Sequence, residues 1–282
     1  MENWYFENQL TGFGYRMKIK QNLEKFRSEY QDIEMMETYD YGKLLTLDGL
    51  VMVTERDEFF YHDAISHPSL FVHPNPEKVL IIGGGDCGTL REVLKHKNVK
   101  EAHLCELDGG VVDVCKRHYS FTQPALDDKR SKLFIQDGFK FLEDNKNEYD
   151  VILVDSTDPI GEAAKLFGEN FFDLCFNALK SDGILAGQAG CYLYDTQVPV
   201  DVYKILKGKF PIARLYTALT PTYPSGFWSF YYASKKYCMV KDFDKNRVIK
   251  SGLDFDYYNE DMHLSFTALP NFFKKALEGK SS

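Results

Sequence analysis

The sequence of 282 residues lacks any apolar run long enough to cross a membrane. Its longest apolar runs, such as Val79–Ile82 and Val151–Val154, have four residues, whereas a membrane-spanning helix needs about twenty. The first eight residues include acids and no basic residue before an apolar stretch, which is not the pattern of a secretion signal. We therefore expect a cytoplasmic protein without a membrane partner.

Cysteines at metal-binding spacings are also missing. The six cysteines, at positions 87, 105, 115, 175, 191 and 238, form no C-x-x-C pair and no cysteine–histidine spacing typical of zinc. We expect them to be reduced, mostly buried, small apolar residues, and we expect no metal site.

Positive charge is scarce as well. Forty-two acids against thirty-four lysines and arginines give a net charge of −8, which disfavours a nucleic-acid partner and is compatible with a cationic ligand. The chain is 44% hydrophobic and 27% charged, which excludes disorder and suits a globular protein with a self-sufficient core.

The chain changes its pattern near residues 73–76. From Leu10 to Met52, short β-like stretches are separated by Tyr-Gly and Asp-Gly turn signals, which predicts a small antiparallel sheet. After the proline-rich join come an apolar strand at Lys78–Ile82, a run of glycines and an amphipathic helix at Thr89–His96. We divide the chain into an N-terminal β domain, residues 1–60, and a Rossmann-like catalytic domain, residues 61–282.

The unit of strand, turn and helix recurs along the second domain. Its further apolar strands are predicted at Ala102–Glu106, Lys132–Gln136, Asp150–Val154 and Gly183–Gly187. Apolar strands that alternate with helices indicate an α/β fold, with a parallel sheet covered by helices on both faces. The segment Phe227–Ala233 predicts one or two more strands, arranged as an antiparallel hairpin at the edge of this sheet.

The run Gly83–Gly88 satisfies G-x-G-x-x-G between a strand and a helix, the context in which a nucleotide can approach the backbone. Glu106, eighteen residues past Gly88, suits a bidentate grip on two ribose hydroxyls. NAD enzymes and adenosyl-sulfonium transferases share both features. Asp86 would repel the pyrophosphate of a dinucleotide, so NAD is the poorer interpretation.

Further acids follow the other predicted strands. Asp137, beside Gly138, can accept a hydrogen bond from an adenine amino group, and Asp155 and Asp158 follow the next strand. A single aspartate at a strand end is more often a helix cap than a ligand group. Acids at four successive strand ends, however, favour a ligand-binding edge of the sheet. Taken alone, Tyr61–His62 indicates packing and Thr222–Gly226 indicates a turn.

Together these motifs resemble the polyamine aminopropyltransferases, over about residues 30–273. The matching segments are Tyr30–Ile33, Leu47–Gly49, Thr54–His62, Gly83–Glu92, Cys105–Asp108, Asp155–Pro159, Pro221–Gly226 and Tyr257–His263. The resemblance implies a β domain followed by a methyltransferase-like α/β domain. It also implies transfer of an aminopropyl group from decarboxylated S-adenosylmethionine, a co-substrate, to a diamine, with no separate cofactor.

The resemblance assigns roles position by position. Residues expected to hold the nucleoside donor are Gln31, His62, Glu106, Asp137 and Gly138, with Asp86 at the terminal amine of the donor. Asp155 matches the proton acceptor of the family, and the diamine channel is expected to be lined by Tyr61, Asp158 and Tyr223. Relatives also suggest a homodimer or homotetramer.

The implied reaction explains these residue types. The attacking amine must be neutral, yet an alkylamine with a pKa of about 10.4 is almost fully protonated at neutral pH. A carboxylate at Asp155 can orient the ammonium and accept its proton as the new bond forms. A carboxylate at Asp86 favours the aminopropyl ammonium and repels the carboxylate of ordinary S-adenosylmethionine.

Three positions depart from the family pattern. Cys87 replaces a glycine, Glu162 follows Gly161 where a proline is frequent, and Gly190 stands where a glutamate is expected by the far end of the acceptor site. Putrescine, giving spermidine and methylthioadenosine, is the leading acceptor, with cadaverine, agmatine or a longer polyamine as alternatives. A small-molecule N-methyltransferase and a non-catalytic nucleoside-binding subunit are the competing hypotheses.

Overall fold

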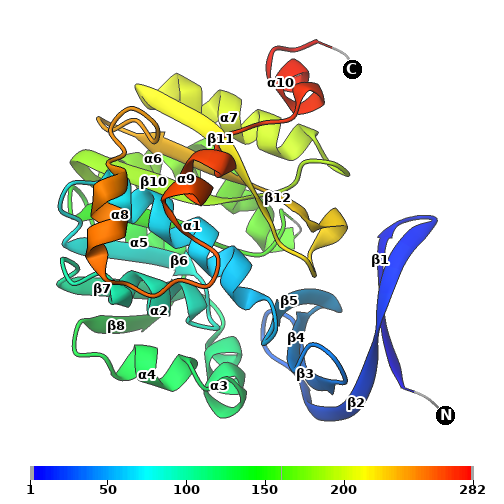
Figure 1. Ribbon diagram of the computed structural model, residues 1–282. Helices are drawn as coiled ribbons and strands as arrows, with labels where there is room; N and C mark the ends of the chain where they lie inside the picture. Colours follow the sequence, from blue (N-terminus) through cyan, green and yellow to red (C-terminus); the bar gives the residue numbers. More distant parts are fainter. Residues whose placement is uncertain (1–2, 160, 281–282) are drawn as a thin grey trace.

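The computed structural model describes residues 3–159 and 161–280, and its strands form two sheets. The first sheet is antiparallel throughout, with strands in chain order, and it lies at the N-terminal end of the molecule (Figure 1). Its strands are β1 (Trp4–Leu10), β2 (Phe13–Arg27), β3 (Asp32–Thr38), β4 (Lys43–Leu47) and β5 (Leu50–Thr54). The antiparallel sheet expected from the turn signals is therefore present.

The first sheet differs from expectation in two respects. It starts at Trp4 rather than near Leu10, and β2 is a single strand of 15 residues rather than several short ones. The register between β2 and β3 shifts twice, between Ile19 and Gln21 and between Asn22 and Glu24. Such bulges interrupt the two-residue alternation of side chains, so the sequence pattern shows fragments where the backbone is continuous.

The second sheet has seven strands in the order β11-β12-β10-β9-β6-β7-β8. The strands from β10 to β8 are parallel, and β11 and β12 form an antiparallel hairpin at one edge, as the sequence predicts. The strands are β6 (Lys78–Gly83), β7 (Glu101–Glu106), β8 (Ser131–Ile135), β9 (Tyr149–Asp155), β10 (Leu179–Cys191), β11 (Ile212–Leu219) and β12 (Phe227–Ser234).

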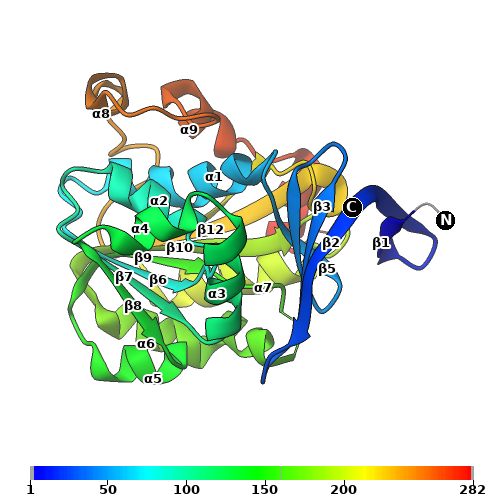
Figure 2. The same cartoon turned by 90° about the horizontal axis from the view of Figure 1, so that it is seen from below.

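Helices cover both faces of this sheet (Figures 1 and 2). Val79 and Ile81 of β6 point to one face and Leu80 and Ile82 to the other, so each face gains an apolar layer. The first face carries α1 (Glu58–Val72), α2 (Gly88–Lys95), α4 (Thr122–Asp127), α8 (Lys245–Ser251) and α9 (Glu260–Phe266). The second carries α5 (Gly138–Asp144), α6 (Glu169–Ala178), α7 (Gln197–Lys209) and α10 (Asn271–Leu277).

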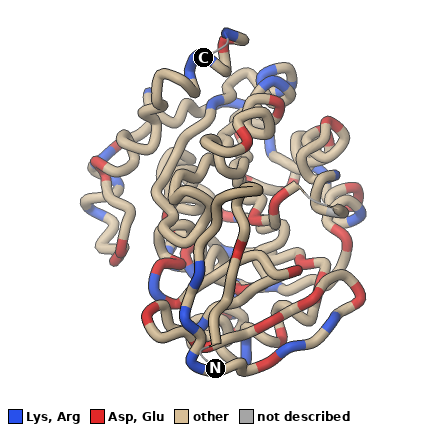
Figure 3. The backbone as a smooth tube through the Cα atoms, turned by 90° about the vertical axis from the view of Figure 1, so that its right-hand side faces the viewer, with Lys and Arg blue, Asp and Glu red and all other residues tan. Residues whose placement is uncertain are grey.

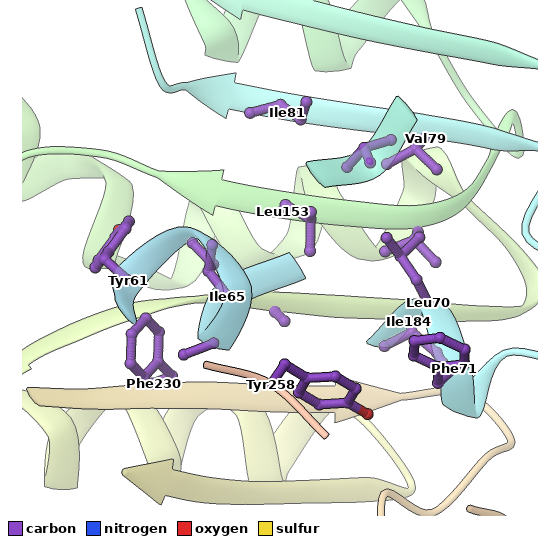
Figure 4. Close-up of a cluster of buried hydrophobic side chains, with 14 of the residues drawn as sticks. Tyr61, Ile65, Leu70, Phe71, Val79, Ile81, Leu153, Ile184, Phe230 and Tyr258 are labelled. Carbon is purple, nitrogen blue, oxygen red and sulfur yellow. The ribbon is translucent and has the colours of Figure 1, made fainter. Parts of the chain in front are cut away.

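Helix α1 was not predicted, and its environment explains why. Every residue from Tyr61 to Val72 is buried, because the helix lies between the sheet and the C-terminal segments. Figure 4 shows Ile65 and Leu70 of α1 with Leu153 of β9 in this core. A helix that is buried all round has no polar face, so it lacks the 3.6-residue hydrophobic period that identifies surface helices.

The first sheet packs against helix α3 (Gly109–His118), which follows β7. Met35, Leu45 and Val53 form one cluster with Val114 and Cys115 of α3. The packing places the first sheet beside the carboxyl ends of the second sheet's strands. The domain boundary between residues 60 and 61 stays a proposal. The chain leaves the first sheet at Thr54, where β5 ends, and enters the second domain at Glu58, where α1 begins.

Acidic and basic residues alternate along much of the chain (Figure 3). Among the described residues, no helix is long and apolar enough to cross a membrane. All six cysteines are free, and five of them are buried.

Candidate active site

A cavity of about 520 Å³ lies where the first sheet meets the carboxyl ends of β6, β7 and β9. Strand β6 has β7 on one side and β9 on the other, so this edge is the topological switch point at which α/β sheets bind ligands. The cavity brings together all ten residues singled out from the sequence: Gln31, Tyr61, His62, Asp86, Glu106, Asp137, Gly138, Asp155, Asp158 and Tyr223.

The glycine run after β6 is shaped by its protein neighbours. A Cβ atom on Gly83 would lie 2.2 Å from the carbonyl oxygen of Asp155, and one on Gly84 would lie 2.9 Å from its Oδ2. A Cβ on Gly88 would lie 2.1 Å from the His62 ring. These glycines therefore admit Asp155 and His62 into the site, a requirement that the nucleotide-loop interpretation did not include.

Cys87, the departure within this run, is fully buried and does not line the cavity. Its φ of +69° is left-handed, a conformation that favours glycine. The thiol faces the carbonyl oxygen of Gly85, at 3.8 Å. The cysteine side chain thus points away from the ligand space.

Asp155, at the end of β9, is held by two hydroxyls. Thr89 donates to its Oδ2 at 2.7 Å, and Tyr61 also donates to the carboxylate. Burial and then the negative charge of Asp86 raise the pKa of Asp155, while His62 opposes the shift. A raised proton affinity is what a proton acceptor requires.

His62 lies between two carboxylates. Its Nδ1 is 2.5 Å from Oε2 of Glu58, and its Nε2 is 3.3 Å from Oδ1 of Asp86. Burial alone would lower the pKa of His62, but Asp86 and Glu58 outweigh burial and hold it well above its usual range. A protonated ring at this position places a positive charge beside the acids of the cavity.

One end of the cavity presents acceptors and donors suited to a nucleoside. Glu106 accepts from the backbone amide of Asp108 at 2.8 Å, and burial raises the pKa of Glu106 to about 7. Gln31 donates to Asp108 at 2.9 Å. Asp137 caps α5 by accepting from the amide of Phe139 at 2.7 Å, so it acts as a helix cap, and its contact with the nucleoside stays a prediction.

The opposite end is aromatic and acidic. The rings of Tyr61 and Tyr223 are 5.5 Å apart, and Trp228 lies 4.8 Å from Tyr223. Burial, followed by the negative charge of Glu7, raises the pKa of Asp158 to about 6. This combination can hold an alkylammonium group by charge and by cation–π attraction.

Glu7 is a lining residue that the sequence analysis missed. It stands on β1, where its Oε2 accepts from the amide of Val51 at 2.7 Å and from the Tyr5 hydroxyl at 2.8 Å. A single acid in a polar N-terminal segment carries no motif, so no signal in the sequence could have identified it.

The expectation that position 190 faces the acceptor stays a prediction. Gly190 is not among the lining residues, but it has no side chain, and a Cβ atom there would meet open space. It lies at a β-bulge in β10 with a φ of +82°, where any larger residue is strained. Gln188 lines the cavity instead, donating to the carbonyl oxygens of Ser156 and Thr157 at 3.1 Å. The side chain of Glu162 lies outside the described part of the chain.

A second buried cluster brings ligand atoms of Asp63, His67 and Glu92 within 4.8 Å of one another. Glu92 is already bound by Lys95 at 2.7 Å, and Asp63 accepts from the amides of Tyr257 and Tyr258. Because these oxygens are already used, we interpret the cluster as an ion-pair network.

Comparison with known proteins agrees with this geometry. Residues 58–245 match the spermine/spermidine synthase domain, and residues 3–55 match the spermidine synthase tetramerisation domain. The chain belongs to the polyamine aminopropyltransferase family. It is 44% identical over 278 residues to the polyamine aminopropyltransferase of Caldicellulosiruptor saccharolyticus, covering 99% of both chains.

Solved aminopropyltransferases have the same fold. A spermidine synthase crystallised with the transition-state analogue AdoDATO superposes with a TM-score of 0.96 at 44% identity, covering 98% of this chain and 95% of the other. The spermidine synthase of Thermotoga maritima gives a TM-score of 0.94 at 44% identity, covering 98% and 94% of the two chains.

The packing of Gly88 against His62 predicts that alanine at position 88 destabilises the protein, whereas alanine at a glycine with open space around it does not. Gly88→Ala should lower the free energy of unfolding by about 1–3 kcal/mol, because its methyl group displaces the buried ring. Gly208→Ala is the matched control: it lies in α7 with open space around it, and alanine should gain up to about 1 kcal/mol there. Urea unfolding at one protein concentration measures both, and equal stability of the two variants would contradict the packing role.

Proposed function

We propose that this aminopropyltransferase transfers the aminopropyl group of decarboxylated S-adenosylmethionine to putrescine, giving spermidine and methylthioadenosine. The observation that carries the proposal is one cavity with a nucleoside-type end at Glu106 and an acidic, aromatic end at Asp158, joined by Asp155. The similarity to a spermidine synthase that binds a transition-state analogue supports it.

Asp155 is proposed as the proton acceptor. The amine nitrogen attacks the carbon next to the sulfonium, the carbon–sulfur bond breaks, and methylthioadenosine leaves with the electron pair on sulfur. The proton of the new ammonium passes to the carboxylate of Asp155. Bringing an alkylamine to its neutral form at neutral pH costs about 4 to 5 kcal/mol, so a neighbouring base lowers the barrier.

The charge of the cavity favours the decarboxylated donor. Nine of the described lining residues are acids, namely Glu7, Glu29, Asp48, Asp86, Glu106, Asp108, Asp137, Asp155 and Asp158. Asp86 sits on the glycine turn beside Asp155, and it can hold the ammonium of the aminopropyl chain. The additional carboxylate of S-adenosylmethionine would meet like charges in a partly dry site.

The acceptor end fits a diammonium rather than a monoamine. While Asp155 receives the reacting nitrogen, Asp158 and Glu7 together can bind the distal ammonium. Tyr61 and Tyr223 enclose the alkyl chain between the two ends. Glu7 thus supplies from the first sheet the acid that Gly190 cannot supply from β10.

We also propose a cytoplasmic homo-oligomer. Six free cysteines suit a reducing compartment. Phe6, Leu10 and Phe13 are exposed on the β1–β2 hairpin, within the segment that matches a tetramerisation domain. Large exposed apolar side chains in one hairpin favour burial against another copy.

Product identification by mass spectrometry tests the function. With saturating decarboxylated S-adenosylmethionine and a panel of putrescine, cadaverine, agmatine and spermidine, we expect putrescine to give spermidine and methylthioadenosine with the highest kcat/KM. Methylated products from S-adenosylmethionine, without aminopropyl transfer, would contradict the proposal and favour an N-methyltransferase.

The Asp155→Asn variant tests the proposed role of Asp155 as proton acceptor in the same assay. The amide keeps the shape of the carboxylate but cannot accept a proton, so kcat should fall by about 10² to 10⁴. Binding of methylthioadenosine, measured by calorimetry, should remain.

Glu106 predicts a pH dependence of nucleoside binding. Its pKa of about 7 in the empty protein means that it is protonated below neutrality and ionised above, and only the carboxylate accepts from both ribose hydroxyls. The Kd of methylthioadenosine should therefore rise about tenfold between about pH 8 and pH 6. The Glu106→Gln variant should bind methylthioadenosine more weakly than the wild type, and its Kd should not change between about pH 6 and pH 8. If the Kd of this variant rises with falling pH as it does in the wild type, Glu106 is not the cause of the pH dependence.

The position of Glu7 predicts that removing its charge weakens the binding of diamines but not of monoamines. Glu7→Gln keeps an acceptor for the Val51 amide but removes the charge, so the KM of putrescine should rise about tenfold or more. The inhibition constant of butylamine, which lacks the distal ammonium, should stay the same. Glu37→Gln, which removes a half-buried acid paired with Lys20 outside the cavity, is the matched charge control. Equal weakening of both amines would show that Glu7 only supports the fold.

A further inference from the structure

Glu58 lies behind the cavity wall, on the side of His62 that faces away from Asp86. It stands one helical turn before His62 on α1, and its carboxylate contacts the ring Nδ1 at 2.5 Å. The other ring nitrogen, Nε2, faces Asp86 at 3.3 Å. Glu58 is not among the residues that line the 520 Å³ cavity; it lines a small adjoining space with His62 and contacts the imidazole directly.

The hydrogen-bond chemistry of this arrangement fixes the state of the ring. An ionised carboxylate can only accept, so an imidazole with a carboxylate at each nitrogen must carry a proton on both. His62 is 2% exposed, and each of its ring nitrogens lies close to one carboxylate. Two carboxylates within 3.3 Å of the two ring nitrogens therefore favour the imidazolium, and one of the two is Glu58.

Glu58 is itself held in place by α2. The guanidinium of Arg91 donates to Oε1 at 2.7 Å and to Oε2 at 2.8 Å, in the bidentate geometry that fixes a carboxylate in orientation. Arg91 in turn donates through Nε to Glu92 at 2.6 Å, and its guanidinium lies 4.7 Å from the Phe121 ring. Glu58 thus cannot rotate away from His62 without breaking this network.

We propose that Glu58 is a positioning residue that acts through His62: it keeps the imidazole protonated, so that a positive charge lies beside Asp86 and keeps Asp155 able to accept a proton in the empty cavity. The proposal rests on the proposed function for the roles of those two aspartates. Without the imidazolium, the negative charge of Asp86 would act uncompensated on Asp155 and raise the pKa of Asp155 further.

The other groups around His62 agree with this assignment. Burial would raise the pKa of Glu58, but His62 and Arg91 lower it to about 2, so Glu58 stays ionised over the whole working range. His62 in turn lowers the pKa of Asp155. The charged and titratable groups near the ring, from all elements packed on it, are Glu58, Tyr61, Asp86, Cys87, Arg91 and Asp155.

The sign of the effect follows from these shifts. If Glu58 is replaced by a neutral residue, His62 loses one of its two carboxylate partners and gives up its proton at lower pH. Without that positive charge the pKa of Asp155 is higher, so Asp155 takes up a proton at higher pH than before. Because a protonated Asp155 cannot accept the proton of the amine, the acid limb of the kcat/KM profile moves to higher pH.

The protonation of His62 can be measured directly by side-chain nitrogen NMR, without any substrate. In the wild-type protein the His62 ring should carry both protons from about pH 6 to pH 8, in contrast to an unperturbed histidine with a pKa of about 6.5. His62→Gln assigns the signal. A neutral ring in the wild type at pH 7 would overturn the proposal, whatever any variant does and whether or not the protein transfers aminopropyl groups.

Glu58→Gln then tests the link to catalysis. The His62 signal should titrate within this range, and the midpoint of the acid limb of kcat/KM for putrescine should rise by about one pH unit or more. Glu77→Gln, which removes an exposed acid paired with Lys100 at 2.7 Å, should change neither.

A double-mutant cycle separates positioning from simple docking of α1 on α2. In a His62→Gln background, Glu58→Gln should not shift the acid limb further, because the group through which it acts is gone. A shift of equal size in both backgrounds would show that Glu58 acts by another route, and the proposal would fail.

Discussion

The site depends on one close contact, between the backbone after β6 and the end of β9. Gly83 is in register with Asp155, the amide of Gly84 donates to the Asp155 carbonyl oxygen at 2.8 Å, and a Cβ on either glycine would collide with Asp155. The contact forms because β6 and β9 are parallel neighbours at the switch point, where their following segments diverge. It places the carboxylate of Asp155 beside the glycine turn that carries Asp86, and the rest of the cavity is arranged around this pair.

A cavity with so many carboxylates is costly for the empty protein. Buried acids lose hydration, and the raised pKa values of Asp155, Asp158 and Glu106 express this loss. The imidazolium of His62 compensates part of the charge near Asp86, and a cationic ligand would compensate the rest. The free energy that the fold loses in keeping these groups ionised is thus available to select positively charged substrates.

The fold and most of the candidate site could be predicted from the sequence, because both depend on patterns of neighbouring residues along the chain. Strands buried on two faces appear as apolar runs, and residues at their carboxyl ends must meet at one edge, so Asp86, Glu106, Asp137 and Asp155 could be placed together. Helix α1, Glu7 and the Glu58–Arg91 pair could not be predicted, because each depends on tertiary neighbours. Gly190 was placed by family resemblance, and the bulge at this position is one that no periodicity in the sequence reveals.

The loop that carries Tyr223 is hydrogen-bonded to residues within the first 57 positions of the chain. Asp57 accepts from the amide of Thr222 at 2.9 Å, the Tyr15 hydroxyl donates to the Thr222 carbonyl oxygen at 2.9 Å, and the Tyr223 hydroxyl donates to that of Met52 at 2.6 Å. These bonds join residues 165 to 207 positions apart. On the ribosome, the first sheet and Asp155 emerge long before this loop does, and closing so long a loop carries an entropic penalty that grows with its length. The wall of the cavity at Tyr223 is therefore among the last parts to assemble, and a nascent chain that already contains Asp155 does not yet have a closed cavity around it.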